Sequence, residues 1–253
     1  IGGIGFADDF SESCDKWSDY MVRINDNVAV DDLLRILAGD KSLSDRSVSE
    51  TFHTGCGESH EGRSLHDYVL DKILASKDEL LIGMPFLGNP DYINALAKCL
   101  ENGVGVHIVF PKTAPSHHYR NLHFIKTLRR RSNNSDRLHV VISPTVNHGK
   151  VIVSDGEIAI LGSYNLHMDC NVLEDTILET TNQDLVSGIR TRFIKSFNDG
   201  IKTNRSSPWR NIIVQSRLEY LSVKLQTIMS KLRSREISRV RRICQLEIKK
   251  WLA

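Results

Sequence analysis

The feature that most constrains the fold is a pair of apolar runs joined by Asp155-Gly156. Residues 150–161 read KVIVSDGEIAIL. An Asp-Gly pair between two runs rich in β-branched residues predicts a tight β-hairpin with a two-residue loop. Both runs are apolar on both faces, which is typical of strands buried between two layers of helices.

The segment before this hairpin alternates between short apolar runs and helical patterns. The predicted elements, in chain order, are strand 80–84, helix 90–102, strand 104–110, helix 124–131 and strand 138–142. Asn89-Pro90 supplies an N-cap and a proline at the first helical position, and Gly103 ends that helix. This β-α-β-α-β order predicts an α/β fold with a mixed, mostly parallel sheet flanked by helices on both faces.

Charge is unevenly distributed along the chain. Residues 201–253 contain 13 Lys/Arg and 3 Asp/Glu, whereas the whole chain has a formal net charge of +2. An apolar stripe in this region has spacings of three and four residues and predicts a helical C-terminal extension with one apolar face. The stripe comprises Leu218, Leu221, Leu225, Ile228 and Leu232. Two interpretations remain open: packing against the body of the protein, or contact with an anionic membrane surface.

The cysteines and histidines do not form a standard structural framework. The chain has 5 cysteines, an odd number without a CxxC pair, which argues against disulfides and favours a reducing, intracellular compartment. No apolar run approaches the ~20 residues that a membrane span needs. Residues 53–66 contain three histidines and one cysteine, but their spacing matches no standard zinc motif. We therefore expect a connector there, without a metal or cofactor.

A candidate site follows from the predicted hairpin. With a two-residue loop, Lys150 lies opposite Leu161 and His148 lies opposite Ser163. Side chains two positions apart share a face of a strand, so His148, Lys150, Ser163 and Asn165 should gather in one patch. An imidazole, an ammonium, a hydroxyl and an amide could bind and cleave a phosphate ester. From the residues alone, ordinary polar groups at the mouth of a hairpin are an equal alternative.

The same residues resemble the signature of a known family. Residues 148–150 read HGK, Asp155 follows after four further residues, and residues 162–165 read GSYN. This pattern resembles the HxKxxxxD…GSxN signature of the phospholipase D superfamily. The resemblance covers roughly residues 68–197, including a Met-Pro-Phe turn at 84–86. Asp155 completes the signature, although its turn position suggests that it orders the hairpin rather than contacts substrate.

The resemblance implies a metal-free mechanism at a site shared by two motifs. In this family one histidine attacks phosphorus, and the other protonates the leaving alcohol. The resemblance implies that His148 is the general acid/base and that Lys150 and Asn165 hold the phosphate. Ser163 and Glu174 would support them, with Glu174 in the place of the acid that holds the histidine.

Only one such motif is present, and the N-terminal residues resemble the end of another repeat. Residues 1–5 read IGGIG and resemble LGSYN at 161–165, and Asp19 of a Trp-Ser-Asp triplet would correspond to Glu174. The second histidine would come from residues upstream in the same protein or from a second copy. The expected organisation is a truncated first-repeat tail at 1–50, a connector at 51–67, a second repeat at 68–200 and a basic helical region at 201–253.

Three functions are consistent with this sequence. The first is a phospholipase D or a cardiolipin-synthase-like phosphatidyltransferase that acts on phospholipids at a membrane surface. The second is a nuclease of the same superfamily, since a nucleic-acid diester undergoes the same chemistry. The third is a binding protein without catalysis, against which the intact set of polar site residues argues.

Overall fold

The computed structural model describes most of the region between Trp17 and Lys202. The described residues are 17–18, 20–24, 26–37, 50–55, 64–111, 115–143, 146–167 and 175–202. They all belong to the first of two compact units, residues 1–204. The second unit, residues 205–253, lies outside the described residues, and so does the predicted amphipathic C-terminal helix.

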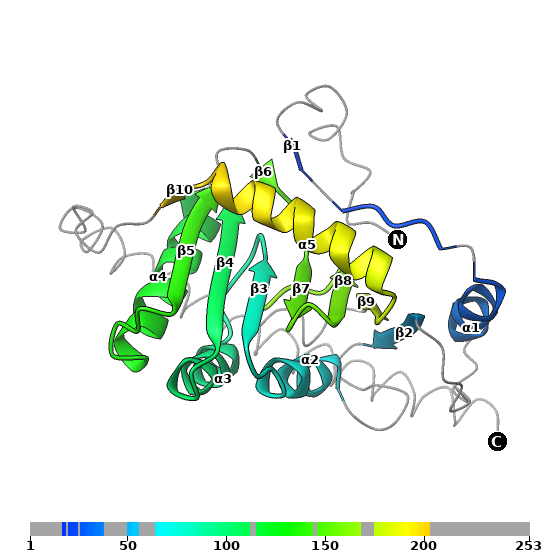
Figure 1. Ribbon diagram of the computed structural model, residues 1–253, viewed down its shortest axis with the longest axis horizontal. Coiled ribbons are helices and arrows are strands. Elements are labelled where there is room, and N and C mark those ends of the chain that lie inside the picture. Colours follow the sequence, from blue (N-terminus) through cyan, green and yellow to red (C-terminus); the bar gives the residue numbers. More distant parts are fainter. Residues whose placement is uncertain are drawn as a thin grey trace, which may run out of the picture. The chain divides into compact units, whose positions relative to one another are not determined.

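The described residues form one large sheet with helices on both sides. The sheet has eight strands in the order β10-β5-β4-β3-β7-β8-β9-β2 (Figure 1). Its strands are β2 (Glu50–Gly55), β3 (Glu79–Gly83), β4 (Gly105–Pro111), β5 (Leu138–Ser143), β7 (Val151–Ser154), β8 (Ile158–Gly162), β9 (Asp175–Thr180) and β10 (Ile201–Lys202). Two short strands, β1 (Trp17–Ser18) and β6 (Val146–Asn147), pair separately and in parallel.

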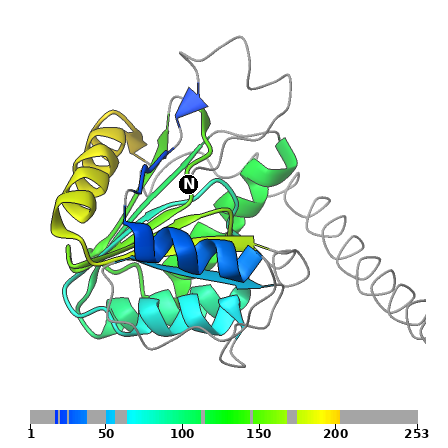
Figure 2. The same cartoon turned by 90° about the vertical axis from the view of Figure 1, so that its right-hand side faces the viewer.

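The helices confirm the predicted α/β class. They are α1 (Asn27–Leu37), α2 (Leu65–Leu74), α3 (Pro90–Glu101), α4 (Pro115–Arg131) and α5 (Gln183–Asn198). Helix α5 crosses one face of the sheet, and α2, α3 and α4 cover the other (Figures 1 and 2). The α5 side is closed by an apolar cluster that includes Leu81, Val151 and Leu161 from the sheet and Phe193 from α5.

The sheet is mixed, as predicted, but most of its strand pairs are antiparallel and not parallel. Of the seven neighbouring strand pairs in the described sheet, only β3–β4 and β4–β5 are parallel. Those strands are joined by the crossover helices α3 and α4, as the sequence pattern predicted. The second half of the sheet is antiparallel because β7 and β8 form a hairpin and β9 and β2 extend it in alternating directions.

The predicted helix ends are correct for α3. Helix α3 begins at Pro90, and the side chain of Asn89 accepts a hydrogen bond of 2.9 Å from the backbone N–H of Asp91. It ends before Gly103, whose φ of 89° reverses the chain. Helix α4 begins at Pro115, well before the predicted start at residue 124.

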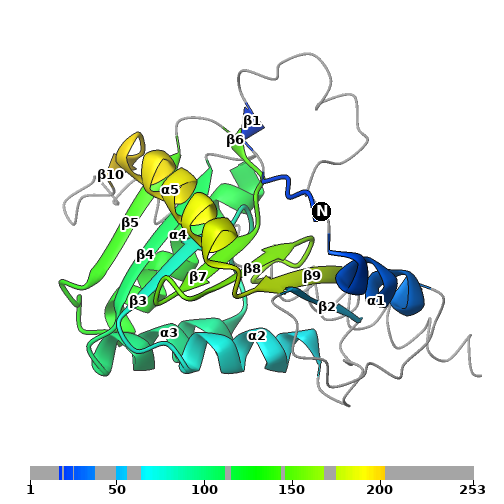
Figure 3. The ribbon, with the colours of Figure 1, turned by 45° about the vertical axis from the view of Figure 1, so that its right-hand side comes forward.

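Two edge strands lie near the expected segment boundaries. Strand β2 pairs with β9 along its whole length at the edge of the sheet, beside α1 (Figure 3), and most of it lies within the expected connector at 51–67. Strand β10 pairs with β5, so the sheet-forming part of the chain extends beyond residue 200. Both strands alternate weakly between apolar and polar residues, and β10 has only two residues, so neither carries a strong strand pattern.

The hairpin is present, but its register differs from the prediction by one residue. Ser154 pairs with Ile158, which leaves a three-residue loop at 155–157. Asp155 and Gly156 have φ values of 54° and 68°, the left-handed conformation for which an Asp-Gly pair is suited. Because of this register, Lys150 lies opposite Gly162, whose N–H donates to the Lys150 carbonyl over 3.3 Å.

Candidate active site

His148 and Lys150 lie together just before β7. The Lys150 ammonium Nζ is 3.3 Å from His148 Nδ1, 3.1 Å from Nε2 and 2.8 Å from the His148 carbonyl oxygen. His148 is half-buried, and the Lys150 side chain lies almost wholly inside the protein. The structure thus brings together the imidazole and the ammonium that the HxK spacing predicted.

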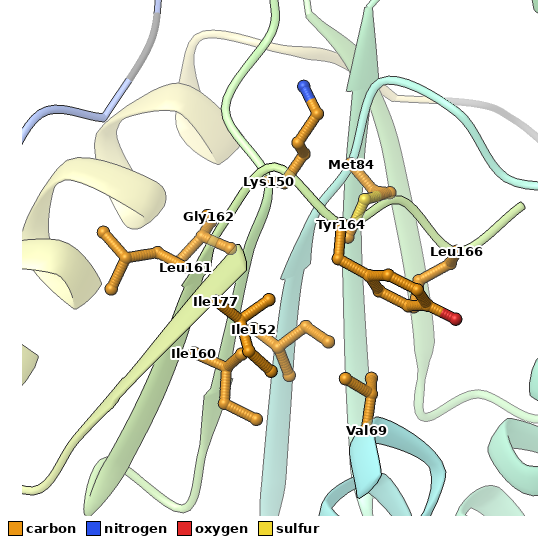
Figure 4. Close-up of a pocket in the computed structure, with 11 residues that line it drawn as sticks. Val69, Met84, Lys150, Ile152, Ile160, Leu161, Gly162, Tyr164, Leu166 and Ile177 are labelled. Carbon is orange, nitrogen blue, oxygen red and sulfur yellow. The ribbon is translucent and has the colours of Figure 1, made fainter. Parts of the chain in front are cut away.

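Lys150 combines an apolar stem with a polar head. Figure 4 shows its ammonium directed away from a small apolar cavity that lies beneath its alkyl chain. The cavity is lined on the α2 side of the sheet by residues that include Val69, Met84, Ile152, Ile160, Tyr164 and Leu166. Packing of the stem among these side chains fixes the position of the charged end near His148.

Gly149, which lies between His148 and Lys150, is held in place by two neighbouring residues. The side-chain oxygen of Asn147, which is buried, accepts a 3.0 Å hydrogen bond from the Gly149 N–H. The ring of Tyr20 occupies the space that a Cβ on Gly149 would need. Tyr20 is itself buried, and the guanidinium of Arg192 lies 5.5 Å from its ring centroid. The glycine of the HGK sequence is therefore required by close packing.

Ser163 and Asn165 follow β8 on the segment next to Lys150. The Ser163 hydroxyl donates a 2.6 Å hydrogen bond to Asp175 Oδ1 and accepts one of 3.0 Å from the Thr176 N–H. The side-chain amide of Asn165 donates to the Ser163 carbonyl oxygen over 3.5 Å. Ser163 is exposed and Asn165 is half-buried, so both border the solvent side of the site.

Asp175 is a site residue that the sequence prediction missed. Its carboxylate is buried, and Oδ2 has no hydrogen-bond partner among the described residues. Burial raises the pKa of Asp175 above its ordinary value, although the Ser163 hydrogen bond and the Lys150 charge act in the opposite direction. The register of β8 and β9, in which Gly162 pairs with Ile177, would have placed this acid beside Ser163. The predicted acid, Glu174, lies outside the described residues.

Asp155 is not brought to the site. It lies at the far end of β7 from His148, and its carboxylate accepts hydrogen bonds from the backbone N–H groups of Lys77, Asp78 and Glu79 at 2.8 to 3.0 Å. Burial alone would raise the pKa of Asp155, but these three N–H groups outweigh it and lower the pKa below its ordinary value. The carboxylate joins the hairpin loop to the start of β3.

Comparison with known proteins identifies the family of this chain. The family model for the phospholipase D-like domain of cardiolipin synthase matches residues 69–197, just over half of the chain. The chain belongs to the phospholipase D superfamily. No curated protein matches its sequence significantly.

Two solved structures of this superfamily share the fold. Nuc from Salmonella typhimurium, a phospholipase D family member, has a TM-score of 0.51 and 18% identity, and the match covers 62% of this chain and 98% of Nuc. Phosphatidylserine synthase from Haemophilus influenzae Rd KW20 has a TM-score of 0.57 and 17% identity, covering 75% of this chain and 49% of the synthase. The chain therefore matches nearly all of Nuc and about half of the synthase.

Phe86 is a further neighbour of His148. The Phe86 ring centroid lies 6.4 Å from that of His148, and the two ring planes meet at 78°. Phe86 belongs to the Met-Pro-Phe turn after β3, at residues 84–86.

The described part of the chain contains neither a candidate metal site nor a candidate membrane span. No three His, Cys, Asp or Glu side chains there gather as a metal site. Of the residues in the 53–66 stretch, Cys56 and His60 lie outside the described ranges. Among the helices of the described ranges, none is both long and apolar enough to cross a membrane.

Proposed function

We propose that this protein cleaves or exchanges phosphodiester bonds, with His148 as general acid/base. The observation that carries the proposal is the contact of the Lys150 ammonium with the His148 imidazole at the end of a buried strand. A phosphate oxygen bound here would contact the Lys150 ammonium, whose alkyl stem is already packed, and would lie beside the His148 imidazole. Preorganised charge of this kind stabilises the negative charge that develops on phosphoryl oxygens.

The reaction then proceeds in two steps. A second histidine, from outside the described residues, attacks phosphorus, and the bond to the leaving alcohol breaks as His148 donates a proton to its oxygen. In the second step His148 removes a proton from water or an acceptor alcohol, whose oxygen attacks the phosphohistidine and releases the product. Lys150 and the Asn165 amide bind the phosphoryl oxygens, and Ser163, Asp175 and Glu174 support the site.

Phospholipid is the substrate that we favour. The matching family model is described as the phospholipase D-like domain of cardiolipin synthase, and a phospholipid carries the diester that this site would bind. The basic C-terminal region would place the enzyme at an anionic membrane surface as a peripheral protein. The odd number of scattered cysteines favours a reducing, intracellular compartment.

We further propose that residues upstream in the same protein, or a second copy of the chain, complete the site and that the N-terminal segment is the end of a first repeat. The supporting observation is a side-chain-capped helix, preceded by a buried apolar residue, that occurs twice. Asp26 Oδ1 accepts from the N–H groups two and three residues ahead at 2.7 and 2.9 Å, and Asn182 Oδ1 does the same at 3.1 and 3.2 Å. Val22 and Leu178, each four residues before the cap, are both buried in the apolar cluster on the α5 side.

The two copies differ in what covers them. Met21 and Val30 are 73% and 38% exposed, whereas Ile177 and Val186, at the same distances from the second cap, are 2% and 0% exposed. Around the Asn182 cap, these positions are covered by the sheet and helices of the second repeat. The exposure of Met21 and Val30 supports the proposal that a further sheet covers them. Upstream residues or another molecule of this chain would supply that sheet.

A second candidate substrate is nucleic acid. Helix α4 exposes Arg130 and Arg131 and partly exposes Lys126, and residues 111–135 contain no acidic residue. None of the large exposed hydrophobic side chains of the described residues lies on α4. A cationic face without apolar residues suits a phosphate backbone better than a lipid interior.

The substrate is tested by supplying the assembled enzyme with anionic phospholipid vesicles and, separately, with single-stranded DNA. We expect lipid turnover that His148→Ala abolishes and that His139→Ala, an exposed histidine on β5, leaves intact. DNA cleavage without lipid turnover would replace phospholipid by nucleic acid as the substrate. Residues 1–253 alone should show only residual turnover, and full activity of a purified monomer would contradict the shared site.

A further inference from the structure

Asn121 is a buried polar residue with two backbone partners in one loop. Its side chain lies on α4 and is 0% exposed. Oδ1 accepts a 2.8 Å hydrogen bond from the Leu87 N–H, and Nδ2 donates one of 2.8 Å to the Pro85 carbonyl oxygen. These two backbone groups stand on either side of Phe86, so a single amide fixes the backbone before and after that residue.

The loop held by Asn121 contacts both sides of the proposed phosphate site. On one side it carries Phe86, whose ring meets the edge of the His148 imidazole. On the other side Leu87 forms a parallel bridge with Leu166, and the Gly88 N–H donates to the Leu166 carbonyl oxygen over 2.9 Å. Leu166 directly follows Asn165, so the loop also ties down the segment that carries the predicted phosphate ligands.

We propose that Asn121 is a positioning residue of the phosphate site. It sets the backbone of residues 85–87, and through this backbone it sets the contact of Phe86 with His148 and the placement of Asn165. The proposal rests on the function proposed above, because the site it positions is the phosphate site.

The chemistry of the amide explains why this side chain suits the position. An amide supplies one acceptor and one donor, which match the Leu87 N–H and the Pro85 carbonyl. Asp at this position would keep the acceptor and place a buried charge against the carbonyl oxygen of Pro85. Ser is too short to reach both groups. In each case a buried backbone group loses its partner, which is unfavourable, so the loop should move to regain one.

The test uses the full 253-residue chain and the variants Asn121→Asp and Asn121→Ser. Leu128→Ala is the matched control, because Leu128 is 0% exposed on the same helix and none of the described hydrogen bonds joins it to the loop. Two quantities are measured by NMR: the chemical shift of the His148 ring, which senses Phe86, and the dissociation constant of inorganic phosphate. Two different substitutions keep the test decisive if one of them fails to fold.

We expect both Asn121 variants to shift the His148 resonance and to weaken phosphate binding at least ten-fold. Leu128→Ala should lower the thermal midpoint and leave both quantities at the wild-type values. The proposal would be overturned if the Asn121 variants lost thermal stability but kept the wild-type His148 resonance and phosphate affinity. If neither the wild-type chain nor the assembled enzyme binds phosphate, the proposed function fails, and the His148 resonance still decides whether Asn121 positions the loop.

Discussion

Replacing Asp155 should lower the stability of the fold and leave the catalytic step unchanged, although this residue belongs to the motif. Asp155 belongs to the HxKxxxxD signature, yet its carboxylate bonds to the backbone N–H groups of Lys77, Asp78 and Glu79 and lies at the other end of β7 from His148. Asp155→Ala removes all three bonds and also places alanine at a φ of 54°. We expect a loss of stability without a loss of catalysis per folded molecule.

The magnitude follows from the bonds that are lost. A carboxylate that caps exposed backbone N–H groups contributes about 1 kcal/mol in similar settings, and three N–H groups that share one partly exposed carboxylate should contribute about 2 kcal/mol together. The left-handed backbone costs alanine roughly 1 kcal/mol more. Asp155→Asn keeps one oxygen and tolerates this backbone, so its loss should be about 1 kcal/mol.

Urea unfolding at several pH values checks the prediction. Because the folded-state pKa of Asp155 lies below its ordinary 3.8, its stabilisation is present above pH 3.8 and disappears as the pH falls through the lower folded value. The difference between wild type and Asp155→Asn should therefore shrink in acid. A variant as stable as wild type whose turnover per folded molecule collapses would refute the structural interpretation of this residue.

Four further substitutions test the packing and charge around the site. Gly162→Ala should destabilise the fold by about 3 kcal/mol in urea unfolding, because its Cβ would overlap the Thr176 carbonyl oxygen; wild-type stability would show that β8 and β9 can separate freely. Gly149→Ala should lower stability because the new Cβ would overlap the Tyr20 ring. Adding Tyr20→Ala should restore part of that stability. Strictly additive effects in the double-mutant cycle would contradict this contact. Asp175 has a raised pKa, so the folded state holds its proton more tightly and stability falls as the pH rises above 3.8. Asp175→Asn should remove that fall, and an unchanged pH profile of stability would contradict it.

The sequence pattern predicted elements whose signals are local. The N-cap at Asn89 and the stop at Gly103 define α3 by short-range hydrogen bonds and backbone conformation, and both are where the sequence placed them. The pairing of His148 with Lys150 also depends on local geometry, since residues two apart on an extended segment share a face.

Features that depend on pairing between distant strands were harder to predict. The hairpin register shifted by one residue because the Asp155 N–H donates to the Glu79 carbonyl oxygen, outside the hairpin, and this leaves a three-residue loop. The antiparallel half of the sheet follows from pairings such as β3 with β7. Asp175 was missed for the same reason, since it reaches Ser163 only through the register of β8 and β9.

The edge position of β2 has a practical consequence for work with fragments of this protein. A polypeptide cut to the span of the family match, residues 69–197, would lack β2 and leave the outer backbone groups of β9 unpaired. It would also lack Tyr20, which fills the space beside Gly149. An uncovered strand edge promotes sheet extension between molecules, so such a fragment should aggregate on expression, and useful truncations begin upstream of Trp17.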